Sequence, residues 1–586
     1  MNERHTKAVS DNTWKAIIFL FSVGLIVFLC CQDMSKLNYI AVLNDEFGYW
    51  GTAASIAGYD WQELIAETPY YSFGYSLLLV PVILLFPTPI LWYKAAIILN
   101  VLLLIISYLI CIKIGTELFP EIDVKFIMLI GTLVTIYPGN IAYAQVAWSE
   151  TLQYFLVWCI TYLIVKLDKK FSVFKTFGII LLLIYLYCVH NRNIGVAAVA
   201  MLCIFLCFWK HKKPIILYIL PVGSLILGYC ALKLVKTYEI AVLWSNSAAS
   251  EMNNLSISSS TFALYFSMLF KNFVLYWESA YGKLFYLLLA TGFTFPIVVL
   301  SIAKEVVGNV KQRDIFKDFL ISKVWCVGIL VIMWLLTALK MMAWTGRKDI
   351  IVYARYMEQT IGPILLLGII YTLFYTKKIR GGILLSGIVF CIGFMGVYQK
   401  IYTAKSYFNS ICAPLFGVFF DNNDSLEKAF TWVIVAMEVM LVGIIISSFI
   451  KGKTVKRILP IIIYITVFCV EGLHVSTYMN NSRKSIEDKT LPVCEQIVQF
   501  EQKEIYYVRD ATDDQYSVNP KYLQFMIPEH KINLIEREQI STVMENETLI
   551  IINPNDKETE ELLLKEENAD KLVSTAKLSL YIKQER

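Results

Sequence analysis

Near its start the chain reads AIIFLFSVGLIVFLCC at residues 16–31 and NDEFGYW at residues 44–50. The first stretch is an unbroken apolar run, close to the length that a helix needs to cross a bilayer. The second places two adjacent carboxylates, Asp45 and Glu46, among aromatic residues shortly after that run. We therefore expect a membrane protein with a polar site close to one face of the membrane.

The composition of the whole chain supports this class. Of its 586 residues, 57% are hydrophobic and only 17% are charged, against about 25% charged in a typical soluble domain. The net charge of +5 does not suggest a nucleic-acid partner. Most of the 13 cysteines lie inside apolar runs, without zinc-ligand spacing. Cys412 and Cys494 fall in predicted outer segments, but nothing in the sequence supports a disulfide between them.

Fourteen apolar runs have the character of membrane-spanning helices. They lie near residues 14–32, 74–91, 92–113, 124–140, 148–166, 175–190, 193–209, 214–235, 283–303, 324–344, 357–376, 381–398, 431–450 and 457–475. Lys and Arg accumulate on the cytoplasmic side of a membrane protein. The basic joints are Lys166–Lys175, Lys210–Lys213, Lys304–Lys323, Lys377–Arg380 and Lys451–Arg457. Basic residues also precede the first run, so we expect a cytoplasmic N-terminus and a retained first span.

The run at 74–91 conflicts with this assignment of sides. Counting back from the joint Lys166–Lys175, one extra crossing at 74–91 would reverse every later side. The run is also short and contains three prolines. We expect it to form an outer-leaflet or re-entrant helix, which leaves about 13 spanning helices and puts residues 476–586 outside.

The end of the chain has a different pattern. Short strands are predicted at Glu504–Val508, Lys531–Ile535 and Glu547–Ile552, and helices at Lys521–Met526 and Lys557–Glu566. We therefore predict an α-helical polytopic membrane domain over residues 1–475, which includes the outer loop 32–91. A small α/β extracytoplasmic domain is predicted over residues 476–586. This second domain has no evident catalytic motif, so we expect it to pack on the site or to position an acceptor.

Three outer segments carry candidate acidic and aromatic site residues. Asp45 could accept a proton from an acceptor hydroxyl, although Asp45 and Glu46 could equally cap a surface helix. Glu150 opens a predicted span, where the helix dipole favours a carboxylate, and it would face the same chamber. Aromatic residues follow in the outer loop and would either anchor it at the interface or form a wall for an amphiphilic substrate. The wall residues are Tyr49, Tyr70 and Tyr71.

Basic residues at predicted outer turns are the more informative signal, because the charge bias of membrane proteins depletes them there. One cluster is His190 with Arg192, a second is Arg347, Lys348 and Arg355 followed by Tyr356, and a third is Lys400 with Lys405. Arginine forks match phosphate oxygens, whereas ordinary headgroup contact would explain any single cluster. Three clusters together favour an anionic lipid headgroup or a lipid-linked phosphate as the ligand.

The constellation resembles the GT-C superfamily of membrane glycosyltransferases. It is most similar to the family 39 type, which includes protein mannosyltransferases and the aminoarabinose transferase of lipid A. The likeness rests on Asp45-Glu46 followed by aromatics, on Pro69-Tyr70-Tyr71, on Glu150, and on Arg355-Tyr356. It covers roughly residues 14–215 and is weaker through 365. The chain departs from the family at Glu67-Thr68-Pro69, where Lys-Pro-Pro is usual, and at Trp148-Ser149-Glu150, where Arg-Pro-Asp is common.

The resemblance implies transfer of a sugar from a polyprenyl-phosphate donor to an acceptor hydroxyl on a glycan, a lipid or a protein. Asp45 would be the base, and inversion at the anomeric carbon would follow. Arg355 or Arg347, with Arg192, would bind the phosphate, together with Tyr356 and His190. Glu46 and Glu150 would orient the acceptor or, with Asp45, hold Mg or Mn. The expected location is the plasma membrane, among its lipids.

Two other functions fit the apolar composition. A polysaccharide polymerase or ligase also uses outer arginines, but an acidic pair directly after the first span is not expected of it. A lipid-linked sugar flippase or transporter would carry charges at mid-membrane depth. Glu438 and Glu471 are the main charges of that kind here, and the sequence assigns neither a role.

Overall fold

The computed structural model describes most of the chain. The described residues are 2–32, 34–36, 40, 43–245, 247–251, 267–312, 314–317, 319–342, 346–375, 379–403, 409–417, 426–450, 452–500, 504–509, 518–543 and 548–583. Lys405, which is predicted to lie in an outer turn, falls outside these ranges.

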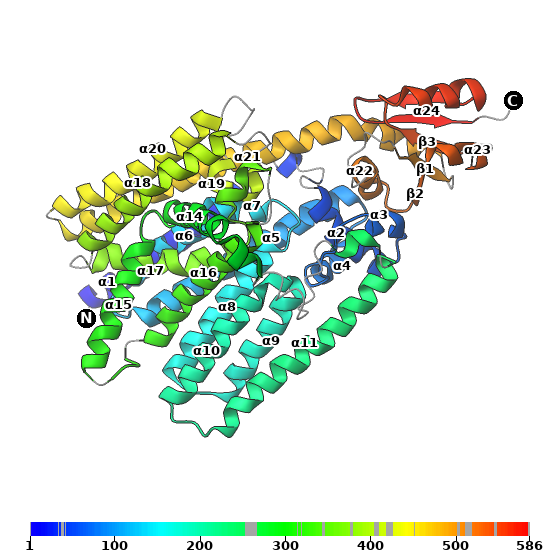
Figure 1. The fold of residues 1–586 in the computed structure, drawn as a ribbon. Helices are drawn as coiled ribbons and strands as arrows, with labels where there is room; N and C mark the ends of the chain where they lie inside the picture. The colour runs from blue at the N-terminus through cyan, green and yellow to red at the C-terminus, as the bar shows by residue number, and fades with distance from the viewer. Residues whose placement is uncertain are drawn as a thin grey trace.

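A bundle of long apolar helices makes up most of the molecule (Figure 1). Within the described ranges, seven helices are long and apolar enough to cross a membrane, or nine if each of two bent pairs forms one span. The long helices are α1 (Asn2–Cys31), α5 (Pro89–Leu118), α8 (Glu150–Lys169), α10 (Ile194–Lys210), α11 (Ile216–Leu243), α16 (Leu320–Met341) and α21 (Lys453–Ile497). The protein is therefore an integral membrane protein, and the number of 13 crossings stays a prediction.

The remaining helices are shorter or bent. They are α2 (Leu43–Ala57), α3 (Gln62–Ala66), α4 (Ser76–Leu85), α6 (Val124–Thr135), α7 (Pro138–Ala144), α9 (Val173–Val189), α12 (Ala248–Glu251), α14 (Phe273–Ala290), α15 (Phe295–Lys311), α17 (Ile361–Phe374), α18 (Ile379–Thr403), α19 (Pro414–Gly417) and α20 (Leu426–Phe449). Short helical turns lie at η1 (Met34–Lys36), η2 (Asn191–Asn193), η3 (Lys348–Val352), η4 (Glu358–Thr360) and η6 (Ser410–Cys412).

The run at 283–303, which is expected to form one span, is bent in the structure. Helices α14 and α15 meet there at an angle of 92°. Gly292 and Phe293 both have positive φ angles, of 54° and 63°, which no α-helix accommodates, and Pro296 lies in the first turn of α15. The apolar composition of the run hid this break, because hydropathy does not report backbone conformation.

Helix α4 corresponds to the first part of the run expected not to cross. It has ten residues and contains Pro81. At 1.5 Å per residue it is about 15 Å long, half of a bilayer's hydrocarbon thickness. It falls among the apolar helices that are too short to span a membrane.

Helix α21 leaves the bundle and carries the C-terminal domain at its far end (Figure 1). The helix is continuous from Lys453 to Ile497, across the boundary expected at residue 475. A five-stranded sheet follows in the order β2-β1-β3-β5-β4, with β1 parallel to β2 and β3, and β5 antiparallel to β3 and β4. The strands are β1 (Ile505–Val508), β2 (Ile532–Ile535), β3 (Leu549–Ile552), β4 (Asp570–Ser574) and β5 (Ser579–Ile582). The helices of this domain are α22 (Val518–Met526), η8 (Arg537–Gln539), α23 (Ile540–Val543), α24 (Lys557–Glu561) and η9 (Leu562–Glu566).

Three of these strands were predicted from sequence, and β4 and β5 were not. The C-terminal domain packs on the outer loop through α22. The Phe525 ring contacts the rings of Trp50 and Trp92 at centroid distances of 5.4 and 6.5 Å, and the Trp61 indole donates to the carbonyl of Pro528.

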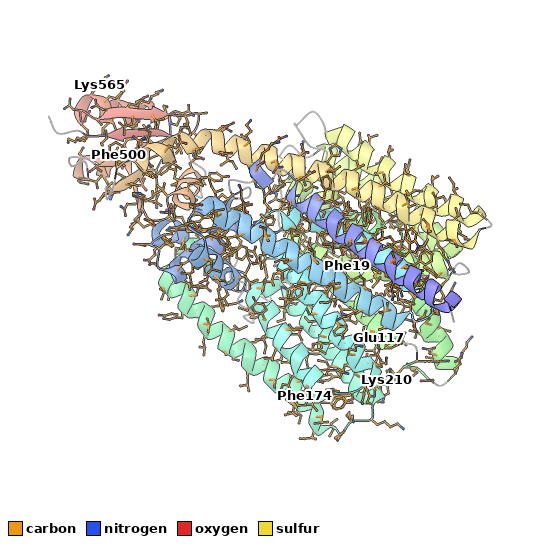
Figure 2. All side chains as sticks on the ribbon, turned by 180° about the vertical axis from the view of Figure 1, so that it is seen from behind. Phe19, Glu117, Phe174, Lys210, Phe500 and Lys565 are labelled. Atoms are coloured by element: carbon orange, nitrogen blue, oxygen red, sulfur yellow. The ribbon has the colours of Figure 1, made fainter. Side chains whose placement is uncertain are left out.

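The opposite end of the bundle carries basic residues of two predicted joints, Lys166, Lys169 and Lys210. Figure 2 shows Glu117 and Lys210 at the end of the bundle away from Phe500 and Lys565. Glu117 forms ion pairs with Lys166 and Lys169 there.

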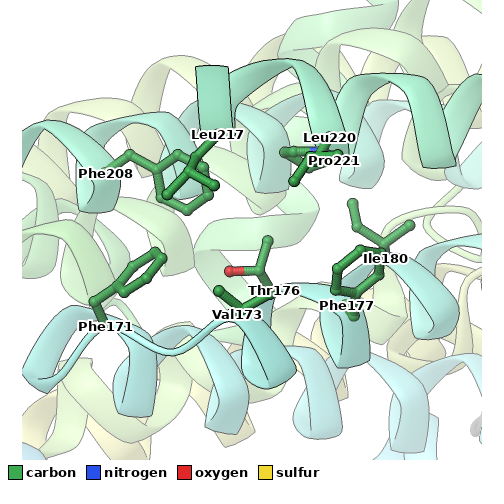
Figure 3. A pocket seen from close by; sticks show the side chains of 9 residues that line it. All are labelled: Phe171, Val173, Thr176, Phe177, Ile180, Phe208, Leu217, Leu220 and Pro221. Atoms are coloured by element: carbon green, nitrogen blue, oxygen red, sulfur yellow. The ribbon is translucent and has the colours of Figure 1, made fainter. Parts of the chain in front are cut away.

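An apolar pocket between α9, α10 and α11 lies near this end, lined by residues such as Phe171, Phe208, Leu217 and Pro221 (Figure 3). Its lining offers no group for acid-base chemistry or phosphate binding.

Candidate active site

Helix α2 presents Asp45 in its first turn, in contact with residues from two distant parts of the chain. The Tyr71 hydroxyl donates to Asp45 Oδ1, and Arg355 Nη1 forms an ion pair with Asp45 Oδ2. The Asp45 side chain is 19% exposed, so it is accessible to a substrate. Burial and the Asp45 carboxylate together raise the pKa of Tyr71 well above its usual value, so the phenol remains protonated and donates.

Glu46 points away from Asp45 into the protein. Its Oε1 accepts hydrogen bonds from the Tyr93 hydroxyl at 2.7 Å and from the Ala147 amide at 2.9 Å. Arg483 of α21, which is fully buried, donates to the same Tyr93 hydroxyl and to the Gln145 carbonyl. Glu46 therefore ties α2 to α5 and to the segment before α8. Sequence reasoning missed Arg483, because it lies beyond the predicted spans.

Arg355 joins the two acidic segments of the site. Its Nε donates to Glu150 Oε1 at 2.6 Å, while Nη1 contacts Asp45. The guanidinium lies 3.6 Å above the Trp148 ring, and the Arg355 amide donates to the Cys412 carbonyl. Burial disfavours this charge, but Asp45 and Glu150 outweigh it and hold the pKa of Arg355 above its usual value.

Arg192 provides a second cation beside the first. Its Nη2 donates to the same Glu150 Oε1 at 3.1 Å, and its guanidinium lies 4.5 Å above the Tyr356 ring. Arg192 Nε and Nη1 are buried and have no hydrogen-bond partner in the described part of the chain. Lys340 lies 5.4 Å from the centre of the Tyr356 ring. Lys340 was missed as a candidate, although a lysine at the outer end of the 324–344 run breaks the charge bias.

His190 is part of this cluster as a neutral group. Its ring nitrogen accepts the Arg192 amide at 3.3 Å, and its ring centre is 6.1 Å from that of Tyr356. Burial, Arg192 and Lys340 lower the pKa of His190 well below its usual value, so it carries no charge at neutral pH.

Two other predicted basic residues, Arg347 and Lys400, form ion pairs with other carboxylates. Arg347 forms a two-point ion pair with Asp349, which is fully buried and also accepts the Asn409 amide. Lys400 pairs at the surface with Glu278. These ion pairs join Arg347 and Lys400 to carboxylates other than Asp45 and Glu150.

The predicted tyrosine wall divides into two parts. Tyr49 and Tyr71 lie side by side at 5.4 Å beside Asp45, and Tyr49 donates to Ser149. Tyr70 points the other way and donates to Glu239 of α11 at 2.7 Å.

The three candidate carboxylates do not form a metal site together. Arg355 lies between Asp45 and Glu150, and Glu46 is directed at Tyr93. Among the residues whose positions are described, no group of three or more His, Cys, Asp or Glu could hold a metal ion. These residues do not fit the Mg or Mn site considered from the sequence.

Two solved structures share the overall fold of this chain. No family model matches the chain, and no curated protein matches it. Among solved structures, ArnT from Cupriavidus metallidurans bound to undecaprenyl phosphate is similar, with a TM-score of 0.52 and 12% identity over 97% of this chain and 98% of that one. The apo state of the same protein gives a TM-score of 0.50 at 12% identity, over 98% of each chain.

Proposed function

We propose that this protein transfers a sugar from a polyprenyl-phosphate donor to an acceptor hydroxyl at the outer face of the plasma membrane, with inversion. The observation that carries the proposal is the pair of arginines on Glu150. Arg355 also holds Asp45, and Arg192 keeps two N–H groups without partners among the described residues. The ArnT structure of the same fold holds undecaprenyl phosphate, which supports this choice of donor.

In this proposal the arginines receive the phosphate of the donor. Unpartnered buried donors such as Arg192 Nε and Nη1 are costly unless a ligand satisfies them, and phosphate oxygens are acceptors for N–H groups of this kind. Negative charge grows on the phosphate as the sugar leaves, and fixed cations lower the energy of that transition state. Tyr356 and Glu150 hold the Arg192 guanidinium in place for this task.

Asp45 is the proposed base on the acceptor hydroxyl. Its carboxylate is the partly exposed member of the cluster, and Tyr71 fixes its orientation. A phosphate that draws Arg355 toward itself would weaken the Asp45–Arg355 ion pair and leave Asp45 the stronger base. Proton removal from a nucleophile by a positioned carboxylate contributes about 10²–10⁴-fold in rate.

The test measures transfer by purified protein in nanodiscs, with radiolabelled undecaprenyl-phosphate glucose, mannose and galactose supplied in turn. We expect Asp45→Asn to lower the rate with the accepted donor by about 10²–10⁴-fold. Asp60→Asn is the matched control: it is an exposed aspartate of the same outer loop, and its ion pair is with Lys531. Transfer by Asp45→Asn at the wild-type rate would refute the assignment of the base.

A further inference from the structure

A small cavity is lined in part by Glu150, the carboxylate that contacts the arginine pair. It is lined by Leu104, Asn140, Tyr143, Glu150, Thr151, Tyr154, Glu358 and Gln359. The cavity volume is ≈ 10 Å³, counted as the space that the centre of a water-sized sphere can occupy. This is room for about one water molecule or one small ion.

Four buried oxygens of the lining have no hydrogen-bond partner among the described residues. They are Glu150 Oε2, Thr151 Oγ1, Glu358 Oε2 and Gln359 Oε1. Each of these side chains belongs to a residue that is at most 3% exposed. Buried polar groups are normally paired, so four such atoms around one cavity indicate an occupant.

The donors of three lining residues, Tyr143, Tyr154 and Asn140, are directed elsewhere. The Tyr143 hydroxyl donates to the Ile411 carbonyl, the Tyr154 hydroxyl to the Val134 carbonyl, and the Asn140 amide to the carbonyls of Val134 and Thr135. The cavity therefore offers oxygen ligands, two of them carboxylate oxygens, and a set of this kind suits a hard cation.

Glu358 is the lining carboxylate without a cation in contact among the described residues. Glu150 contacts two arginines, whereas Glu358 Oε1 accepts from the neutral hydroxyls of Tyr286, at 2.5 Å, and Tyr137, at 3.2 Å. A bound cation would stabilise the ionised form of Glu358. A buried carboxylate without a cation in contact is strongly unfavourable. A Cβ atom at Gly139 would lie 2.8 Å from Glu358 Oε2, so glycine keeps this oxygen uncovered.

We propose that the cavity binds one alkali-metal cation of sodium size, held by Glu150, Thr151, Glu358 and Gln359. One positive charge matches the single uncompensated carboxylate. The space leaves no room for the water molecules that Mg²⁺ usually keeps. The ion fixes the second oxygen of Glu150 and so positions the carboxylate that holds Arg192 and Arg355. This site is separate from the sugar donor and does not rest on the proposed reaction.

The experiment uses the full-length purified protein in nanodiscs, in choline chloride buffer at constant ionic strength and without any sugar donor. We expect the wild type to retain about one ²²Na⁺ per chain after rapid desalting. Replacing choline with Na⁺ should raise the unfolding temperature by a few °C, with a smaller effect of K⁺. Both readouts are independent of transfer activity, so a failure of the proposed function would leave them unchanged.

Two variants test the ligands. Glu358→Gln removes the charge that the ion balances, so it should lose ²²Na⁺ and no longer respond to Na⁺, while unfolding in choline at or above the wild-type temperature. Thr151→Val keeps the shape and removes one oxygen, so it should bind Na⁺ about tenfold more weakly. Glu471→Gln is the matched control, because Glu471 is a buried carboxylate without a hydrogen-bond partner in the described chain and does not line the cavity.

Three outcomes would overturn the proposal. The first is a wild type that retains no ²²Na⁺. The second is a Glu358→Gln variant that responds to Na⁺ as the wild type does. The third is a wild type that ignores Na⁺ but loses stability as the pH rises from 6 to 9, with Glu358→Gln abolishing that loss, since Glu358 would then be protonated.

Discussion

Helix α8 carries a buried carboxylate at each end, and the two have opposite environments. Asp168, in the last turn, pairs with Lys210 at 2.5 Å and accepts the Ser322 amide and hydroxyl at 3.0 and 2.8 Å, so both of its oxygens have partners. Glu150, in the first turn, shares one oxygen between two arginines, and its other oxygen has no hydrogen-bond partner among the described residues. A carboxylate whose two oxygens are paired, such as Asp168, holds the structure together. Glu150 and Arg192 contact each other, yet each keeps polar atoms without partners among the described residues, and these atoms can bind ligands.

Removing Asp168 should have the largest effect on stability. Asp168→Ala leaves Lys210 unpaired and the Ser322 amide buried without an acceptor. We expect the free energy of unfolding to fall by about 3 kcal/mol, since losing one partner of a buried pair is strongly destabilising. Thermal unfolding in nanodiscs measures this. Folded Asp168→Ala should still bind undecaprenyl phosphate like the wild type, and weaker binding would contradict the comparison.

Removing the charge of Glu150 should affect transfer more than folding. Glu150→Gln keeps the shape but releases Arg192 and Arg355 from their shared oxygen. We expect the transfer rate to fall by about 10²–10³-fold, a range typical for loss of a preorganised electrostatic group. The unfolding temperature should change less than in Asp168→Ala. A variant that unfolds as readily as Asp168→Ala would make Glu150 a structural residue.

Arg192 should act through the phosphate. Arg192→Gln removes a charge-assisted donor, a loss worth about 1.5–3 kcal/mol. We therefore expect undecaprenyl phosphate to bind about 10–100-fold more weakly, measured by calorimetry in nanodiscs. Arg347→Gln is the control, because Arg347 pairs with Asp349 and we expect its loss to reduce stability and leave phosphate affinity unchanged. If both variants bound undecaprenyl phosphate equally weakly, Arg347 would also be a phosphate ligand.

The sequence predicted the membrane bundle and the segments that meet at the site, because hydropathy, charge bias and a short motif are local signals. It could not predict which members of those segments touch. Asp45 and Glu46 are adjacent in sequence yet point to different partners, since successive helical residues project about 100° apart. No sequence motif marks Glu358 or Lys340. Their importance depends on how α7, α16 and η4 pack together. The break between α14 and α15 was hidden because hydropathy does not report backbone conformation.

The smallest expected effect concerns the third basic cluster. Lys400 pairs with Glu278, and both side chains are well exposed, at 55% and 40%. Surface ion pairs contribute about 0–1 kcal/mol, so Lys400→Gln should change the free energy of unfolding by no more than that. Undecaprenyl phosphate should bind as it does to the wild type, in contrast to Arg192→Gln. If Lys400→Gln instead lowered the affinity as Arg192→Gln does, the donor's phosphate would have to reach far beyond Glu150, and the distinction between buried, unsatisfied arginines and exposed, paired lysines would fail.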